Sequence, residues 1–341
     1  MKRCKNILVY LAVVSLVILA FAANLFYGSV DIPAGEVLSI ISGNGCERDV
    51  WRVVVLETRL PQALTALLAG ASISVAGLLL QTVFRNPLAG PEVLGVNSGA
   101  GLGVAVVMLL FGGSSLMGVN GISGYVVVLA GAFAGALLVM AVILLLATFL
   151  RNNMFLLIAG VAVSYITSSA ITLLNYFSTA EGVHSYMVWG MGSFGAVSME
   201  QMSFFTPITM LLLTVSLLMM KPLNALLLGD SYARNLGVNV KKVRGAALCV
   251  TGLLTAVVTA FCGPVSFIGL AVPHIARLSL RSNNHRHLIP ATMILGGGVA
   301  LLCNLVCQLP GESGLLPLGA ITPLIGAPVI IYVIVKNRGV R

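Results

Sequence analysis

Charged residues are scarce in this sequence of 341 residues. Lys, Arg, Asp and Glu together make up 9% of the chain, whereas an average soluble domain contains roughly 25% of them. Hydrophobic residues make up 58%, and the mean hydropathy is +1.04. This composition excludes a soluble globular protein, and the length has room for about ten membrane spans of roughly 20 residues. We therefore expect an all-α, polytopic integral membrane protein without a soluble catalytic domain.

Motifs for catalysis and cofactor binding are also missing. The sequence has no G-x-x-x-x-G-K-S/T phosphate-binding loop, so we expect that the chain cannot hydrolyse ATP alone. The six cysteines have no metal-ligand spacing, and Gly190–Gly195 matches G-x-G-x-x-G without the preceding strand of a nucleotide-binding unit. His285 and His287 could bind a metal, but a solvated basic turn is the better interpretation, and His274 could touch a substrate. No cofactor is therefore expected on this chain.

Apolar runs separated by breakers predict the membrane spans. They lie at residues 7–27, 60–83, 93–110, 122–148, 154–178, 199–220, 243–262, 269–281, 288–309 and 317–335. The eighth run is short and contains Pro273, His274 and Arg277. It fits a half-span buried among other helices, where irregular backbone is tolerated.

The distribution of charge orients these spans. With both termini in the cytoplasm, only Arg48, Arg52 and Arg59 of the nineteen basic residues fall on the outer face. All of the acidic residues except Glu92 and Asp230 fall on that outer face. The pattern follows the positive-inside rule and so supports ten spans. It also explains the high pI without a nucleic-acid partner, and none is expected.

The N-terminal run has two interpretations. Lys2, Arg3 and Lys5 precede an apolar stretch, and Ala20–Ala22 could be the cleavage site of a signal peptide. However, the apolar run continues to Phe26, and cleavage would leave the remaining spans starting from an outside N-terminus. A retained first helix is the favoured interpretation.

Small residues predict close helix packing in the third and fourth spans. Gly95, Gly99 and Gly103 recur every four residues in the third span, and Gly131 and Gly135 do so in the fourth. Such spacing lets helix backbones approach closely. This feature occurs in channels, transporters and membrane enzymes alike.

Residues 221–244 form an unusually basic connection between two apolar runs. This segment, KPLNALLLGDSYARNLGVNVKKVR, contains five Lys or Arg residues and spaced apolar positions on two short helix-like pieces. Most other connections are only a few residues long. The segment therefore indicates a docking surface for a cytoplasmic protein, with a solvated cytoplasmic loop as the alternative.

Six separated blocks carry a family resemblance that spans residues 55–338. They are RLP at 59–61, FRNPLA at 84–89, LGVNSGAG at 94–101, LGD and YARNLGV at 228–238, GPVSFIGLAVPHIAR at 263–277 and LIGAP at 324–328. In this order they resemble the permeases of ATP-binding cassette (ABC) importers for iron-siderophore complexes, haem and cobalamin.

The resemblance implies an architecture for the whole chain, 1–341, as one permease domain. Family members are ten-helix subunits that pair as homodimers in the bacterial inner membrane, with a substrate-binding protein above and two ABC ATPase subunits, which use ATP and Mg²⁺, beneath. Residues 221–244 then become the ATPase-coupling region. Its candidate residues are Leu228, Gly229, Asp230, Tyr232, Ala233, Arg234, Leu236 and Gly237.

The resemblance also implies gate and docking residues. Asn86 matches the inner gate, and Asn152 and Asn153 stand at a second gate turn where the family often has small hydroxyl residues. Polar residues of the fifth span could line the path, although their hydroxyls could equally bond to their own helix; they are Ser164, Thr167 and Ser168. Three residues match positions that receive the binding protein, where the family often has arginines: Arg59, Gln62 and Gln308. Arg48 or Arg52 could substitute for the missing arginines.

These features predict a permease that moves an iron chelate, a siderophore complex or haem, by alternating access. A corrinoid such as cobalamin is the alternative substrate within the family. An ion-coupled secondary transporter is the rival from another class, but it should show intramembrane acids or broken inverted repeats. The acidic residues here fall in connections or at span ends.

Overall fold

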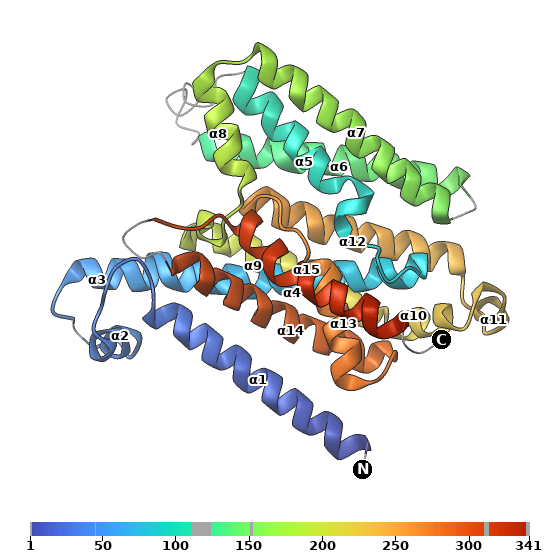
Figure 1. Ribbon diagram of the computed structural model, residues 1–341, viewed down its shortest axis with the longest axis horizontal. Coiled ribbons are helices and arrows are strands. Elements are labelled where there is room, and N and C mark those ends of the chain that lie inside the picture. Colours follow the sequence, from blue (N-terminus) through green and yellow to red (C-terminus); the bar gives the residue numbers. More distant parts are fainter. Residues whose placement is uncertain (1, 45, 111–123, 151–152, 310–313, 339–341) are drawn as a thin grey trace.

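The computed structural model describes residues 2–44, 46–110, 124–150, 153–309 and 314–338, and within them it contains helices and no strand (Figure 1). Each of the ten apolar runs forms a helix: α1 (Lys2–Phe26), α4 (Leu60–Phe84), α5 (Val96–Ala105) with its continuation η3 (Val106–Leu110), α6 (Gly124–Phe149), α7 (Asn153–Phe177), α9 (Met199–Leu218), α12 (Val240–Cys262), α13 (Ile268–Leu280), α14 (His285–Gln308) and α15 (Leu318–Arg338). Six of them are long and apolar enough to cross a membrane, and α1, α5, α13 and α15 contain shorter apolar stretches. The all-α membrane fold is confirmed.

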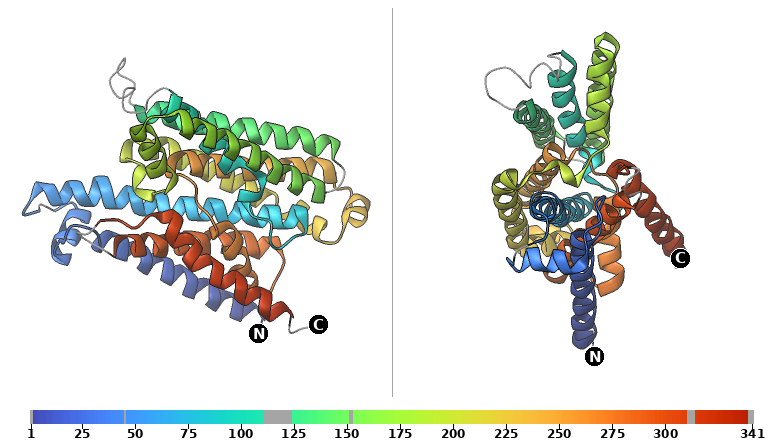
Figure 2. Two further views of the ribbon diagram at one scale, coloured as in Figure 1. Left: turned by 45° about the horizontal axis from the view of Figure 1, so that its top comes forward. Right: turned by 90° about the vertical axis from the view of Figure 1, so that its left-hand side faces the viewer.

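Short helices lie at both ends of the bundle. α2 (Ala34–Ile41), α3 (Asp49–Val53), η1 (Val54–Arg59), α8 (Ala180–Gly190) and η5 (Phe194–Ala196) are at one end, and α10 (Met220–Leu227) and α11 (Asp230–Asn235) are at the other (Figure 1). The start of α1 and the end of α15 lie toward the end that carries α10 and α11 (Figure 2). The two chain ends and the basic segment therefore share one side of the protein.

The helix α4 runs through the centre of the bundle. It packs against α14, α12, α13 and α9, and nearly all of its side chains are buried. Glycines permit these contacts: a Cβ atom on Gly77 would lie 1.8 Å from the carbonyl oxygen of Gly269 in α13. Because α4 touches so many neighbours, any displacement of its end must be shared by the helices around it.

The predicted glycine faces meet each other. α5 and α6 pack side by side, and a Cβ on Gly103 would lie 1.9 Å from the carbonyl oxygen of Gly131. A Cβ on Gly135 would lie 2.1 Å from the carbonyl oxygen of Gly99. Gly95 instead faces Gly160 and Ser164 of α7. The prediction of close backbone approach is thus confirmed, with Gly95 against α7 and the other four glycines between α5 and α6.

The eighth run is short, as predicted. α13 begins after Phe267, whose φ of 65° lies in the left-handed region, and it packs against α4, α14 and α15. The backbone N–H of Phe267 donates to Glu92 Oε1 at 3.0 Å, and Glu92 belongs to η2 (Pro91–Leu94). The irregular backbone before α13 therefore has a partner inside the protein, which is the condition for such backbone at membrane depth.

Candidate functional site

The candidate coupling region consists of two short helices, as the sequence predicts. Gly229 separates α10 from α11 with a φ of 111°, and Gly237 follows α11 with a φ of 79°. Residues with a Cβ are strained at these angles, so glycine sets both breaks. The backbone N–H of Gly237 donates to the carbonyl of Arg234 at 2.9 Å and closes the turn.

The coupling region has an inner and an outer side. Leu223, Leu226 and Ala233 are fully buried against the bundle. The candidate residues on the other side are exposed, with 63% of Leu228, 54% of Tyr232 and 58% of Leu236 accessible. Arg234 and Leu227 are exposed beside them. An apolar surface of this kind, on a polar connection outside the spans, is typical of a protein contact.

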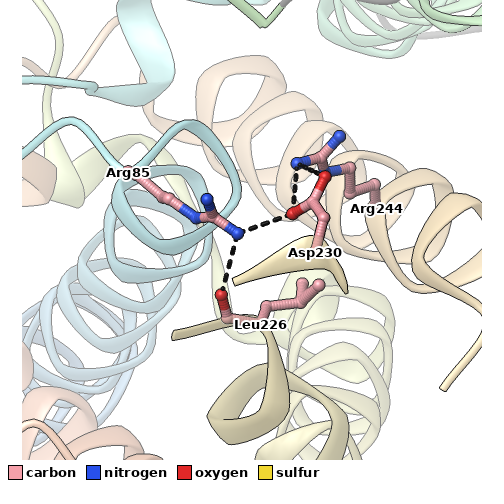
Figure 3. Close-up of polar contacts among 4 residues, drawn as sticks. All are labelled: Arg85, Leu226, Asp230 and Arg244. Carbon is pink, nitrogen blue, oxygen red and sulfur yellow. Dashed lines mark hydrogen bonds and ion pairs between the residues drawn. The ribbon is translucent and has the colours of Figure 1, made fainter. Parts of the chain in front are cut away.

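Asp230 has an internal role that the sequence did not reveal. Its Oδ1 lies 2.5 Å from Arg85 Nη2 at the end of α4, and its Oδ2 lies 2.8 Å from Arg244 Nη2 in α12 (Figure 3). The same nitrogen of Arg85 donates to the carbonyl of Leu226 in α10 at 3.2 Å (Figure 3). Asp230 therefore ties the coupling region to two long helices.

A second anchor joins the coupling region to α4. His285 is 1% exposed, which corrects the prediction of a solvated turn at this residue. Its Nδ1 donates to Asn224 Oδ1 of α10 at 2.9 Å, and its Nε2 lies 2.8 Å from Thr82 Oγ1 of α4. Both ring nitrogens of His285 therefore have partners within the protein. Across the described residues, no three His, Cys, Asp or Glu side chains gather closely enough to hold a metal ion.

The candidate gate turn follows α4 directly. Arg85 ends α4 in the left-handed conformation, with a φ of 48°, and Asn86 Oδ1 accepts the N–H of Leu88 at 2.9 Å. His274 Nε2 donates to the carbonyl of Pro87 at 2.8 Å, so this side chain fixes the turn to α13. Asn86 thus sits one residue beyond the arginine that binds the coupling region.

The remaining gate and pathway candidates lie on α7 or directly before it in the sequence. Asn152 lies outside the described residues, and Asn153 is the first residue of α7. Ser164 donates to the carbonyl of Gly160 at 3.0 Å, and the buried Thr167 donates to the carbonyl of Val163 at 3.1 Å. Both hydroxyls therefore bond to their own helix, as the alternative interpretation holds. Ser168 is exposed on α7.

The structure buries Arg59, the first of the candidate docking residues. Only 3% of this residue is exposed, whereas docking to a binding protein requires an accessible charge. Its guanidinium donates to the carbonyls of Leu25 and Phe26, both at 2.9 Å, and to the carbonyl of Val30. Leu25 and Phe26 end α1, so Arg59 supplies a cation to the C-terminus of that helix.

Gln62 and Gln308, the other two candidate docking residues, are also buried. Gln308 donates to Gln62 at 3.2 Å, and Gln62 donates to Asn304 at 3.0 Å. Asn304 donates to Asn24 of α1 at 2.7 Å. This chain of amides joins α4, α14 and α1 inside the protein. In contrast, Arg48 and Arg52 are exposed, and Arg48 lies over the ring of Trp51.

Replacing Arg59 by methionine should destabilise the protein by about 2 kcal/mol, because the buried carbonyls at the end of α1 lose their charged donor. Thermal unfolding in detergent would measure the loss. The exposed Arg52→Met is the matched control and should change stability by less than about 0.5 kcal/mol. An unchanged stability of Arg59→Met, together with slower binding-protein association, would instead make Arg59 a docking residue.

The sequence analysis missed the residues that anchor the coupling region: Arg85, Arg244, Asn224, Thr82 and His285. One signal was present. Asp230 is one of only two acidic residues predicted on the inner face, and it lies in a segment with five basic residues. A carboxylate in such surroundings is expected to find an arginine.

Comparisons with known proteins agree with this architecture. The model of the FecCD transport family matches residues 16–336. The vitamin B12 import system permease protein BtuC of Klebsiella pneumoniae is 35% identical over 324 residues, covering 95% of this chain and 92% of the relative. The BtuC protein of Salmonella paratyphi A is 35% identical over 333 residues, covering 98% of this chain and 96% of that protein.

A solved structure has the same fold. It is described as a metal-chelate type ABC transporter in an inward-facing conformation. The TM-score is 0.83 at 27% sequence identity, and the match covers 96% of this chain and 98% of the other. The family model, the relatives and the structural neighbour cover nearly the whole chain, so the resemblance is not limited to single motifs. This protein belongs to the FecCD transport family of ABC transporter permeases.

Proposed function

We propose that this permease imports a corrinoid such as cobalamin. The support is that the relatives with 35% identity over almost the entire chain are vitamin B12 import permeases. These relatives favour the corrinoid over the iron chelate that the sequence analysis put first. The iron chelate remains the second candidate, because the structural neighbour at 27% identity is a metal-chelate type transporter.

The coupling region carries the mechanistic part of the proposal. Its exposed surface of Leu228, Tyr232, Leu236 and Arg234 would contact an ATPase subunit in the cytoplasm. Asp230 connects that surface to Arg85, the residue before the candidate gate residue Asn86. Binding of ATP by the partner would then move the coupling region and the gate turn together, and the substrate site would alternate between the two sides.

The assembly is part of the same proposal. Two copies of the chain would pair, with exposed apolar residues of α7 and α15 available for the contact, such as Tyr165, Ile166 and Leu324. In the end-on view these helices stand at the edge of the bundle (Figure 2). Two ATPases would bind the end with α10 and α11, which the positive-inside rule would place in the cytoplasm. A binding protein would meet the opposite end, where Arg48 and Arg52 offer accessible cations.

Uptake by a reconstituted transporter tests the function and the substrate. Vesicles that contain the permease with its co-purifying ATPase and binding protein should accumulate labelled cobalamin when ATP is supplied on the ATPase side. Vesicles with the permease alone should show only background uptake, because the chain has no phosphate-binding loop. Uptake of a ferric siderophore but not of cobalamin would select the second candidate. Uptake at the full rate by the permease alone would refute an ATP-driven importer.

A further inference from the structure

A cleft of about 620 Å³ lies where the end of α6, the start of α12 and the helix α11 meet. One part of its wall is apolar and includes Leu144 from the end of α6, Leu150 directly after it, Leu156 from α7 and Leu248 from α12. The other part is polar and consists of Asp230, Arg234, Lys241 and Arg244 together with small residues. The cleft is therefore amphipathic, and it lies at the level where membrane spans end.

The polar part of the cleft has unused positive charge. Among the described residues of the wall, Asp230 is the single acid, and it already pairs with Arg85 and Arg244. Within the described part of the chain, neither Arg234 nor Lys241 forms an ion pair, and Arg244 Nε is buried without an acceptor. An anion in the cleft would supply the missing acceptor and counter-charge.

The start of α12 adds to this positive field. Arg234, Val240 and Lys241 line the cleft and also an adjoining open hollow of about 420 Å³. Asn239 caps α12 by accepting the N–H of Lys242, so Val240 and Lys241 form the first turn of a helix of 23 residues. The positive end of a helix dipole attracts phosphate groups.

The apolar part of the cleft distinguishes a lipid from a soluble anion. Leu138, Leu145 and Phe149 of α6 are exposed apolar side chains of a predicted span, so the outer side of this helix faces the acyl chains of the bilayer. A soluble phosphate would use only the basic wall. A phospholipid carries a phosphate and an acyl chain in one molecule, and it could reach the cleft along α6.

We propose that this cleft binds an anionic phospholipid of the inner leaflet, with the phosphate at Lys241 and Arg244 and an acyl chain along Leu144 and Leu248. Basic pockets between transmembrane helices at the cytoplasmic side suit such headgroups. The lipid would lie beside α11 and would stabilise the end of α12 that holds Asp230. The proposal does not depend on the identity of the transported substrate.

Lipid retention by the purified permease tests the proposal. The protein in detergent is incubated with phosphatidylglycerol or phosphatidylcholine of identical acyl chains, and bound lipids are counted by native mass spectrometry. Wild-type protein should retain phosphatidylglycerol in preference to phosphatidylcholine. Lys241→Gln should weaken that retention about fivefold, as one charge near a membrane surface contributes about 1 kcal/mol. Lys221→Gln, which removes an exposed cation of α10 outside the cleft, should leave retention unchanged.

Further arms separate the possible sources of binding. Ala147→Phe should fill the apolar part of the cleft and reduce phosphatidylglycerol retention, while inorganic phosphate at millimolar concentration should not displace the lipid. Thermal unfolding without lipid checks that each variant folds. If Lys241→Gln does not fold, Lys241→Glu takes its place. Equal retention of both lipids, equal losses in Lys241→Gln and Lys221→Gln, or displacement by inorganic phosphate would overturn the proposal.

Discussion

Replacing Asp230 by asparagine should lower substrate uptake by about tenfold in the assembled transporter, within the range of roughly 5- to 150-fold that typical coupling free energies give. The variant keeps the shape of the side chain but removes the charge that joins Arg85 and Arg244. Because these pairs are partly exposed, the loss of stability should stay near 1 kcal/mol. Measured in the same vesicles, ATP hydrolysis should therefore continue while substrate uptake falls.

Two further variants control this experiment. Arg85→Gln should reproduce the uptake defect, and the double variant should be no worse than Asp230→Asn alone, because residues of one network are not additive. Glu200→Gln removes an exposed acid at the start of α9, at the opposite end of the bundle, and should have no effect. Wild-type uptake by Asp230→Asn would show that movement reaches the gate turn by another route.

The helices of this protein could be predicted from the sequence because their causes are local. Apolar runs and the breakers between them located all ten predicted membrane elements, six of which are long enough to cross a membrane. The short α13 was indicated by the length of its run and by Pro273. Likewise, the glycine spacing of α5 and α6 predicted close packing, because glycine has no side chain to keep two backbones apart. The glycines did not reveal that these two helices are each other's partners.

The roles of the polar residues could not be predicted in the same way, because their partners are distant in the sequence. Arg59 bonds to carbonyls 29 to 34 residues away, and Gln308 bonds to Gln62 across 246 residues. A family motif indicated that these positions matter at the outer end, but it could not show whether a side chain points outward or inward. His285 illustrates the same limit at the inner end, since a basic neighbourhood suggested solvent while Asn224 and Thr82 lay folded against it.

Gly237→Pro should abolish stable association with the ATPase, with a loss of at least about tenfold in the amount that co-purifies. Proline fixes φ near −65°, whereas Gly237 has a φ of 79° and uses its N–H to bond to Arg234. The turn must therefore be rebuilt, which displaces Arg234 and Leu236 from the exposed surface. Gly237→Ala separates the effects of proline from those of a side chain alone. The added Cβ meets no atom within 4 Å, and the N–H is kept. This variant should therefore retain most of the association despite roughly 1–2 kcal/mol of backbone strain.

The opposite end of the protein offers a matched control for this last experiment. Gly43 also has a positive φ, of 77°, and has open space around it, but it follows α2 at the far end from α11. Gly43→Pro should disturb its own turn and leave ATPase association at the wild-type level. If both proline variants lose the ATPase equally, the cause is general misfolding. If Gly237→Pro keeps it while the protein inserts normally, α11 is not the docking element, and the exposed Leu228 and Tyr232 need another partner.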